Sequence, residues 1–153
     1  MTHTWPADWF DRKAGVGCHI CAQGRPVETA GGVRFYSGEF ADAYLRKRAH
    51  LPGQSMVIWR GRHASDLIDL SDEEAAGYMN DLRRAARLLN TVFEPCQINY
   101  LTFGNSVPHI HTYVVPRYLD DPNPGAPLLP LVETEIDRAE LQRQLEALER
   151  AAE

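Results

Sequence analysis

The sequence lacks the long apolar run that a transmembrane helix needs, since it contains no stretch of about 18 apolar residues. It also lacks the pattern of a secretory signal peptide. The first residues are MTHTWPADWFDRK, with acidic residues and two tryptophans in place of a basic stretch followed by an apolar one. We therefore expect a cytoplasmic protein with no membrane partner.

An excess of basic residues is absent as well. The chain has 16 Lys and Arg residues against 21 Asp and Glu residues, a net charge of −5, and no basic cluster. Binding along a nucleic-acid backbone needs a stripe of Lys and Arg that displaces counterions, so we expect no nucleic-acid partner. A small phosphorylated ligand still fits this composition, because one pocket needs only a few local donors.

Cysteine is scarce, and an odd number of three cysteines without an export signal argues against a disulfide framework. Cys18 and Cys21 form a C-x-x-C pair, a spacing compatible with a zinc site, a redox pair or chance. A redox pair would open a helix after a strand, whereas the preceding KAGVG is turn-like, which weakens that interpretation. A structural zinc would need two further ligands, which the histidines of the chain could supply.

The length and hydrophobic content predict one domain over residues 1–153 with its own core. Alternation and turn residues predict strands at 31–40, 42–51, 55–60, 98–103 and 109–116. These strands, together with one long helix and a C-terminal helix, indicate an α+β fold with a mostly antiparallel five-stranded sheet. We expect an irregular arm at 1–30, the core at 31–119, and a Pro-rich segment followed by the C-terminal helix at 120–153.

Both expected helices have a recognisable start. Ser71-Asp72-Glu73-Glu74 is a capping box, and apolar residues recur three or four positions apart until Pro95 ends the long helix. Thr134 and Asp137 give the C-terminal helix, expected at about 134–152, the same kind of start.

The strand at 109–116 carries the most unusual pattern. Because successive side chains of a strand point to opposite faces, His109, His111 and Tyr113 should share one face, and Ile110, Thr112 and Val114 the other. Two alternating histidines also occur on ordinary solvated faces, so this spacing alone leaves a reactive and a structural interpretation open.

The segment PHIHTYVVPRY resembles the motif of the histidine-triad superfamily, in which three histidines alternate with apolar residues and Pro-Arg often follows. The longer stretch INYLTFGNSVPHIHTYVVPRYLDDPNPG is similar to the bacterial branch of diadenosine polyphosphate hydrolases. LPGQSMVIWRGRHASDLIDLSDEE resembles the strand, histidine loop and helix start of the same family. The resemblance covers roughly residues 15–130 and implies a HIT-like fold.

The resemblance also implies an activity, namely cleavage of a nucleoside phosphate, with adenosine as the family's commonest nucleoside, at the α-phosphorus. His111 would be the nucleophile, since an imidazole titrates near physiological pH and offers an unprotonated nitrogen. The resulting nucleotidyl-histidine would then be cleaved by water. We expect the other ring nitrogen of His111 to donate to a backbone carbonyl of the neighbouring strand.

Further roles follow from matching positions in the family. The residues implied in substrate binding are Asn99, Asn105, Ser106, His109 and Tyr113. Gly104-Asn105-Ser106 is also an ordinary turn, so a structural role stays open there. Arg117 follows Pro116 as in the family and is expected to be exposed.

Related superfamily members bind zinc through a C-x-x-C, a histidine before the long helix and the first triad histidine. In this chain those positions are Cys18, Cys21, His63 and His109, a closed set of four ligands that suits a structural zinc. His50 is an alternative ligand.

The third triad position is Tyr113, where the family has histidine. A tyrosine hydroxyl donates a hydrogen bond to a phosphate but cannot become cationic, which puts rate and substrate in question. Alternatives are a nucleotide-binding or sensing module with reduced or no turnover, a nucleotidyl transferase, and an interaction protein in which the histidines are purely structural. The resemblance further implies a homodimer paired along the long helices.

Overall fold

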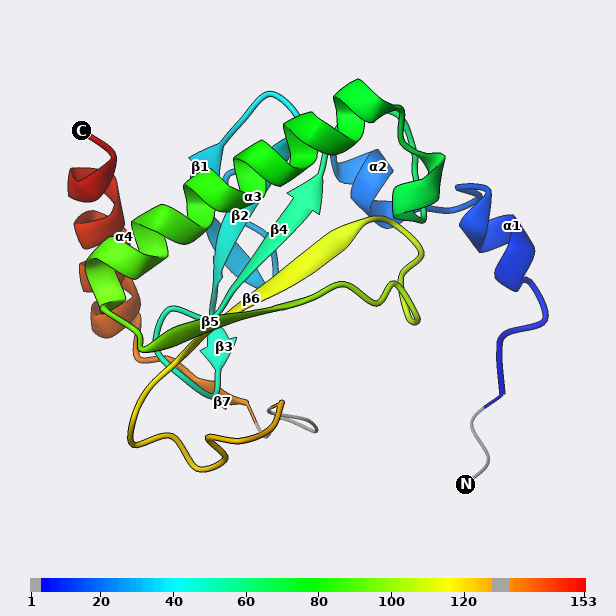
Figure 1. Cartoon of the computed structure of the whole chain (residues 1–153). Helices are drawn as coiled ribbons and strands as arrows, with labels where there is room; N and C mark the ends of the chain where they lie inside the picture. The colour runs from blue at the N-terminus through cyan, green and yellow to red at the C-terminus, as the bar shows by residue number, and fades with distance from the viewer. Residues whose placement is uncertain (1–3, 128–132) are drawn as a thin grey trace.

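The structure is a computed structural model that describes residues 4–127 and 133–153. Five antiparallel strands form one sheet in the order β1-β2-β4-β6-β5 (Figure 1). The strands are β1 Gly32–Ser37, β2 Ala41–Arg46, β4 Ser55–Trp59, β5 Gln97–Leu101 and β6 His111–Arg117. A two-stranded sheet pairs β3, Arg48–Ala49, with β7, Thr134–Glu135. The α-helices are α1 Trp9–Lys13, α2 His19–Gln23, α3 Asp72–Phe93 and α4 Arg138–Ala152, and Leu67–Asp69 form the 3-10 helix η1. The α+β expectation is therefore confirmed.

Helix α3 begins and ends as its sequence indicates. Ser71 Oγ accepts a hydrogen bond from the Glu74 backbone N–H, and the Glu74 carboxylate accepts one from the Ser71 N–H. This reciprocal pair satisfies two of the N–H groups that a helix start leaves without partners. The helix stops at Glu94, which adopts the left-handed conformation with φ 47° just before Pro95.

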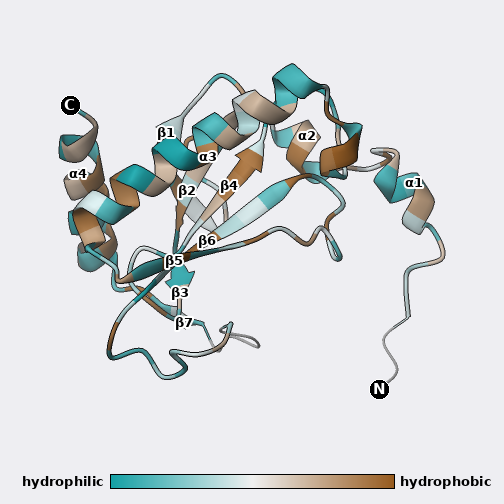
Figure 2. Cartoon of the chain, viewed as in Figure 1, coloured by the Kyte–Doolittle hydropathy of each residue, from teal (hydrophilic) through white to brown (hydrophobic). Residues whose placement is uncertain are grey.

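The apolar face of α3 covers one face of the sheet (Figure 1). Alternate sheet residues point toward it and are almost fully buried: Ala41, Ala43, Leu45, Val57, Trp59 and Val114. Leu82 and Leu89 of α3 pack against them, together with Leu148 of α4. Figure 2 shows β4, at the centre of the sheet, as one of the most hydrophobic segments, while α3 alternates between hydrophobic and hydrophilic turns. Burying each leucine stabilises the fold by about 2 kcal/mol.

The two ends of the chain differ from the expected pattern. Two short helices, α1 and α2, lie within the arm that we expected to be irregular. At the other end, Thr134 lies in β7 and does not cap a helix. The α4 cap is Asp137, whose side chain accepts hydrogen bonds from the backbone N–H groups of Ala139 and Glu140. Pairing with β3 therefore takes precedence over the first turn of the expected helix. Residues 128–130 of the expected Pro-rich segment lie outside the described residues.

Within the described residues, no helix is both long enough and apolar enough to span a membrane.

Candidate functional site

The sheet face turned away from α3 carries the histidine pattern. Thr112 and Val114 of β6 point toward α3, where the hydroxyl groups of Thr112 and Tyr78 are 2.8 Å apart. Side-chain alternation therefore places His111 and Tyr113 on the opposite face. We call this surface, formed by His111 and Tyr113 with their cross-strand neighbours on β4 and β2, the histidine face.

The register arranges the histidine face in rows across the strands. Ile58 pairs with His111, and Asp42 pairs with Ile58, which gives one row. Met56 pairs with Tyr113, and Tyr44 pairs with Met56, which gives the next row. These rows are the framework on which the other side chains of the site are placed.

The His111 imidazole has a defined orientation. Its Nδ1 is 2.7 Å from the backbone carbonyl oxygen of His109. A carbonyl can only accept, so Nδ1 carries a proton and donates it, and in the neutral ring the lone pair is then on Nε2. We expected an acceptor on the neighbouring strand; the structure corrects this to the residue two positions earlier in the chain.

The reactive nitrogen of His111 is accessible, although the residue is only 9% exposed. Nε2 has no hydrogen-bond partner among the described residues. The one fully buried side-chain nitrogen or oxygen without a partner in this part of the chain is Oε1 of Gln144, so Nε2 of His111 still contacts solvent. In its neutral form His111 thus offers the Nε2 lone pair from a strand that is paired with β4 and β5.

Tyr113 stands beside the histidine. The two ring centroids are 5.6 Å apart with an interplanar angle of 74°, an edge-to-face contact. On the tyrosine lies the guanidinium of Arg46, with Cζ 5.4 Å from the ring centroid. Arg46 is a residue that the sequence reasoning missed. The alternation of Asp42, Tyr44 and Arg46 along β2 was the signal that would have placed it on this face.

Cys18, Cys21, His63 and His109 come together in one cluster. Their candidate ligand atoms all lie within 4.8 Å of one another. His109 Nδ1 is 3.5 Å from Cys18 Sγ and 3.6 Å from Cys21 Sγ, and His63 Nδ1 is 3.5 Å from Cys21 Sγ. A tetrahedral zinc separates a sulfur ligand from a nitrogen ligand by about 3.6 Å, as its metal–ligand lengths of about 2.3 and 2.05 Å require. The four residues therefore fit such an ion, and neither His19 nor His50 belongs to the cluster.

Both imidazoles of the cluster are held in the tautomer that binds metal. Nε2 of His109 lies 2.8 Å from the carbonyl oxygen of Trp59, and Nε2 of His63 lies 3.0 Å from that of Lys13. Each Nε2 must donate to its carbonyl, so each Nδ1 points a lone pair into the cluster. Burial lowers the pKa of His109 to about 4, which keeps that ring neutral. Burial and the adjacent Cys18 thiol raise the pKa of Cys21 to about 11, so ion binding has to displace thiol protons.

The loop before α2 is shaped to fit the cluster. Gly15 has φ +96°, and a Cβ on it would lie 2.9 Å from Cγ of His63. A side chain at this position would therefore strain the backbone and push against a candidate ligand. Cys18 caps α2, with its Sγ accepting from the Cys21 backbone N–H.

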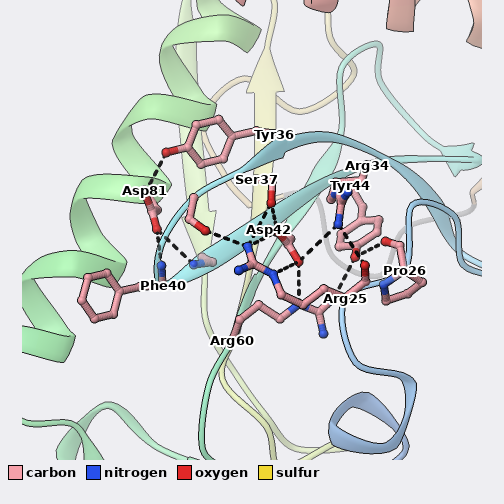
Figure 3. Close-up of polar contacts among 12 residues, drawn as sticks. Arg25, Pro26, Arg34, Tyr36, Ser37, Phe40, Asp42, Tyr44, Arg60 and Asp81 are labelled. Atoms are coloured by element: carbon pink, nitrogen blue, oxygen red, sulfur yellow. Dashed lines mark hydrogen bonds and ion pairs between the residues drawn. The ribbon is translucent and has the colours of Figure 1, made fainter.

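A second set of contacts fastens the N-terminal arm to the sheet (Figure 3). The fully buried Asp42 carboxylate accepts hydrogen bonds from Arg25, with Nη2–Oδ1 at 2.5 Å, and from Arg60, with Nε–Oδ2 at 2.9 Å. Arg60 also donates to Tyr44 Oη, which in turn donates to the Pro26 carbonyl oxygen. Burial alone would raise the pKa of Asp42, but the hydrogen bonds from Arg25 and Ser37 hold it below its usual value.

Asn99, Asn105 and Ser106, which the family resemblance implies in substrate binding, make no hydrogen bond to His111 among the described residues. Asn105 and Ser106 are exposed in the loop between β5 and β6, and Ser106 lines a cavity of about 270 Å³ together with Cys18 and His19. The side-chain oxygen of Asn99 accepts a hydrogen bond from Arg117 Nη1 at 2.7 Å.

Arg117 is buried, contrary to the expectation of an exposed side chain. It is 6% exposed and forms an ion pair with Asp121, with Nε–Oδ2 at 2.7 Å. It also donates to the carbonyl oxygens of Asn123 and Ala126. These bonds satisfy the guanidinium inside the protein and fix the segment that follows β6.

The Phe35, Tyr36, Val57 and Trp59 side chains belong to the core or pack against it.

Comparison with known proteins identifies relatives of this chain. The sequence model of the HIT domain family matches residues 30–120. AP-4-A phosphorylase of Mycobacterium tuberculosis is 35% identical over 92 residues, which are 56% of this chain and 47% of that protein. Bis(5'-adenosyl)-triphosphatase of Saccharomyces cerevisiae is 27% identical over 89 residues, 55% of this chain and 43% of that protein. The chain spans about half the length of these curated relatives.

Solved structures share the fold. A histidine triad protein from Bradyrhizobium japonicum has a TM-score of 0.72 at 22% identity, over 79% of this chain and 90% of that one. A Zn-bound histidine triad family protein from Mycobacterium smegmatis has a TM-score of 0.62 at 28% identity, over 90% of this chain and 96% of that one.

Proposed function

The chain belongs to the HIT domain family, and on this premise we propose that it cleaves a nucleoside phosphate or dinucleoside polyphosphate at the α-phosphorus through a nucleotidyl-His111 intermediate. The orientation of His111 carries the proposal: Nδ1–H is bound to the His109 carbonyl oxygen, and Nε2 is accessible. The names of the two relatives, a bis(5'-adenosyl)-triphosphatase and an AP-4-A phosphorylase, favour adenosine as the nucleoside.

The proposed reaction has two displacements. The Nε2 lone pair of His111 attacks the α-phosphorus, the bond from phosphorus to the leaving-group oxygen breaks, and that oxygen leaves as a phosphate anion. In adenosine phosphoramidate the phosphorus–nitrogen bond breaks instead, and the nitrogen takes a proton from solvent and leaves as ammonia. Positive charge develops on the ring, and the hydrogen bond from Nδ1 to the His109 carbonyl oxygen stabilises it. Water then attacks phosphorus, the nitrogen–phosphorus bond breaks, and the nucleoside monophosphate is released. Inorganic phosphate in place of water would make the protein a nucleotidyl transferase.

We propose that a structural zinc is held by Cys18, Cys21, His63 and His109. The spacing of the ligand atoms and the tautomers of the two histidines support this proposal. Bound zinc supplies a crosslink with four protein ligands and no open position for substrate. Both ring nitrogens of His109 are occupied in this arrangement, so we assign that ring to the metal and not to the substrate. The His109 backbone carbonyl orients His111, and the metal therefore acts by positioning the nucleophile.

The proposed homodimer has a suitable surface. Strand β5 is at the edge of the sheet and leaves a row of backbone groups open to pairing with another strand. Beside it a groove of about 470 Å³ runs between α3 and β5, lined by Arg87, Asn90 and Tyr100 among others. A second copy related by a two-fold axis would extend the sheet across β5, which sedimentation of the purified protein tests.

The decisive experiment measures AMP release from diadenosine polyphosphates and adenosine phosphoramidate. His111→Ala should abolish release, because no other imidazole nitrogen is free on the histidine face of the described chain. His50→Ala, which removes a histidine from the turn before β4, is the matched control and should keep activity. Full activity in His111→Ala would end the proposal.

Tyr113 supports a second candidate, a nucleotide-binding module with little turnover. Its hydroxyl can donate to a phosphate oxygen but cannot add positive charge as a third histidine would. A burst of one AMP equivalent followed by a stalled phosphorus–histidine adduct would identify a slow enzyme, and binding without any product would identify the module. We expect Tyr113→His to raise the rate of release.

A further inference from the structure

On the histidine face, Arg46 lies on the side of Tyr113 that is opposite to His111. Asp42 is in the row of His111, Tyr44 is in the row of Tyr113, and Arg46 is two residues farther along β2. At about 3.3 Å per residue, its backbone is roughly 13 Å along the strand from the row of the nucleophile. Its side chain reaches back over the tyrosine ring, with Cζ 5.4 Å from the centroid.

The Arg46 guanidinium is held on two of its three nitrogens. Nη2 is 2.6 Å from Glu133 Oε2, and Nε donates to the Arg48 carbonyl oxygen at 3.2 Å. Nη1 has no hydrogen-bond partner among the described residues, and neither has Tyr113 Oη. Neither atom is among the fully buried unpartnered ones, so both are open to solvent. A cationic donor therefore lies over the Tyr113 ring, and that ring contacts His111.

Glu133 and β7, which we call the C-terminal segment, hold the Arg46 side chain in place. Glu133 directly precedes β7, which pairs with β3, and its carboxylate also accepts a hydrogen bond from Gln54 Nε2 at 3.2 Å. Gln54 is 1% exposed and in turn accepts from the His50 backbone N–H. Glu133 therefore helps to set the direction of the guanidinium through its bond to Nη2.

Other arginines near this face are paired with protein groups through some or all of their nitrogens, and Arg25 and Arg34 both contact Asp42. Arg60 is bound to Asp42 and Tyr44, and Arg117 to Asp121 and two backbone carbonyls. Arg46 differs from them because its guanidinium lies over the Tyr113 ring and its Nη1 has no partner among the described residues. Guanidinium groups bind phosphate oxygens with charge-assisted hydrogen bonds, which are stronger than neutral ones.

We propose that Arg46 Nη1 and Tyr113 Oη bind phosphate oxygens of the leaving group, on the far side of the α-phosphorus from the nucleoside that becomes attached to His111. This inference rests on the proposed function and narrows its substrate class. A leaving group that carries a phosphate chain reaches Arg46, whereas a short uncharged leaving group does not. The chain should therefore prefer dinucleoside polyphosphates to adenosine phosphoramidate.

The test compares diadenosine tetraphosphate with adenosine phosphoramidate in wild type, Arg46→Gln and Arg46→Lys. Arg46→Gln should lower kcat/KM for the tetraphosphate by about tenfold to a hundredfold, mainly through KM, and change that for the phosphoramidate by less than twofold. Arg46→Lys keeps the positive charge but lacks the planar guanidinium that can bind two phosphate oxygens at once, so it should recover part of the loss. Arg48→Gln is the matched control, since Arg48 is exposed and its Nη2 donates to the Glu133 backbone carbonyl oxygen and not to the carboxylate.

An equal loss on both substrates, or no loss on either, would overturn the inference while leaving the nucleophile in place. Wild type that releases AMP from neither substrate would instead refute the proposed function. In that case calorimetry with inorganic tripolyphosphate still decides the assignment of Arg46, because wild type should bind it at least tenfold more tightly than Arg46→Gln does. Equal affinity of the two proteins would reject the anion site as well.

Discussion

The N-terminal arm and the C-terminal segment both lie against the histidine face, but different chemistry fastens them. The arm is joined to the sheet by the cysteine–histidine cluster and by Arg25, which reaches the fully buried Asp42. The C-terminal segment is joined by the two-residue pairing of β3 with β7 and by the partly exposed ion pair between Arg46 and Glu133. The arm contacts Asp42 in the row of His111 and also Tyr44 in the row of Tyr113, whereas the segment binds Arg46, which lies over the Tyr113 ring.

This difference indicates separate tasks for the two ends. The arm holds His109, whose carbonyl oxygen sets the His111 tautomer, so it has to be rigid. The C-terminal segment orients one arginine at the position proposed for the leaving group, where substrate has to enter and product has to depart. Metal ligands with short, directional bonds suit the first task, and a single partly exposed ion pair, which is easier to break, suits the second.

Removal of the metal should cause the largest loss of stability, and the loss of local protection should be limited to the arm. With free zinc a thousandfold above its dissociation constant, binding stabilises the fold by about 4 kcal/mol. EDTA or Cys18→Ser should then lower Tm by about 10 °C. Hydrogen exchange should show lost protection at residues 9–24 and unchanged protection at β7. Uniform loss across both ends would show that they are not independent.

Cys96→Ser serves as the control for the loss of a thiol. Cys96 is exposed, far from the cluster in sequence, and its Sγ donates to the Arg117 carbonyl oxygen. This variant should keep about one zinc per chain by mass spectrometry under native conditions, and the Cys18→Ser variant should keep none. Equal zinc content in the two variants would remove Cys18 from the ligand set.

The next largest loss of stability should come from breaking the contacts of Asp42 with Arg25 and Arg60. Asp42→Asn removes the charge that faces Arg25 and Arg60 and leaves the Arg60 guanidinium, 6% exposed in its side chain, without its counterion. Losing one partner of a buried pair costs about 3 kcal/mol, which chemical denaturation can measure. The substituted carboxamide keeps the size of the side chain, so the loss reports charge and not a cavity. Asp8→Asn removes a half-exposed partner of Arg12 and should leave stability unchanged.

The fold could be predicted from the sequence where a single local rule decided the structure. The capping box at Ser71, the apolar repeat of the long helix and the strand alternation all agreed with the packing that α3 makes. The C-terminal helix start was wrong because Thr134 has an alternative partner, Ala49, that is distant in sequence. Local capping rules carry no information about such pairings.

The candidate site was predictable only in part, for the same reason. His63 and His109 were placed with the cysteines through the family resemblance, and the cluster in the structure has those four members. Arg117 was expected at the surface because arginine usually is, but Asp121 and two carbonyls follow within nine residues and enclose it. Arg46 was missed because its contacts are distant in sequence. Tyr113 lies in β6, and Glu133 directly precedes β7.

The smallest expected effect is an acid response confined to the C-terminal side of the sheet. The Arg117 guanidinium holds the pKa of Asp121 at about 2, below the value of 3.8 for an ordinary aspartate. Because the folded-state pKa is the lower one, this ion pair stabilises the fold fully above about pH 4. The contribution is lost as the pH falls toward 2. Tm measured from pH 5 to 2 should therefore decline less in Asp121→Asn than in wild type, whereas the exposed neighbour variant Asp120→Asn should follow wild type. If Asp121→Asn and wild type decline in parallel, the acid response arises from other carboxylates.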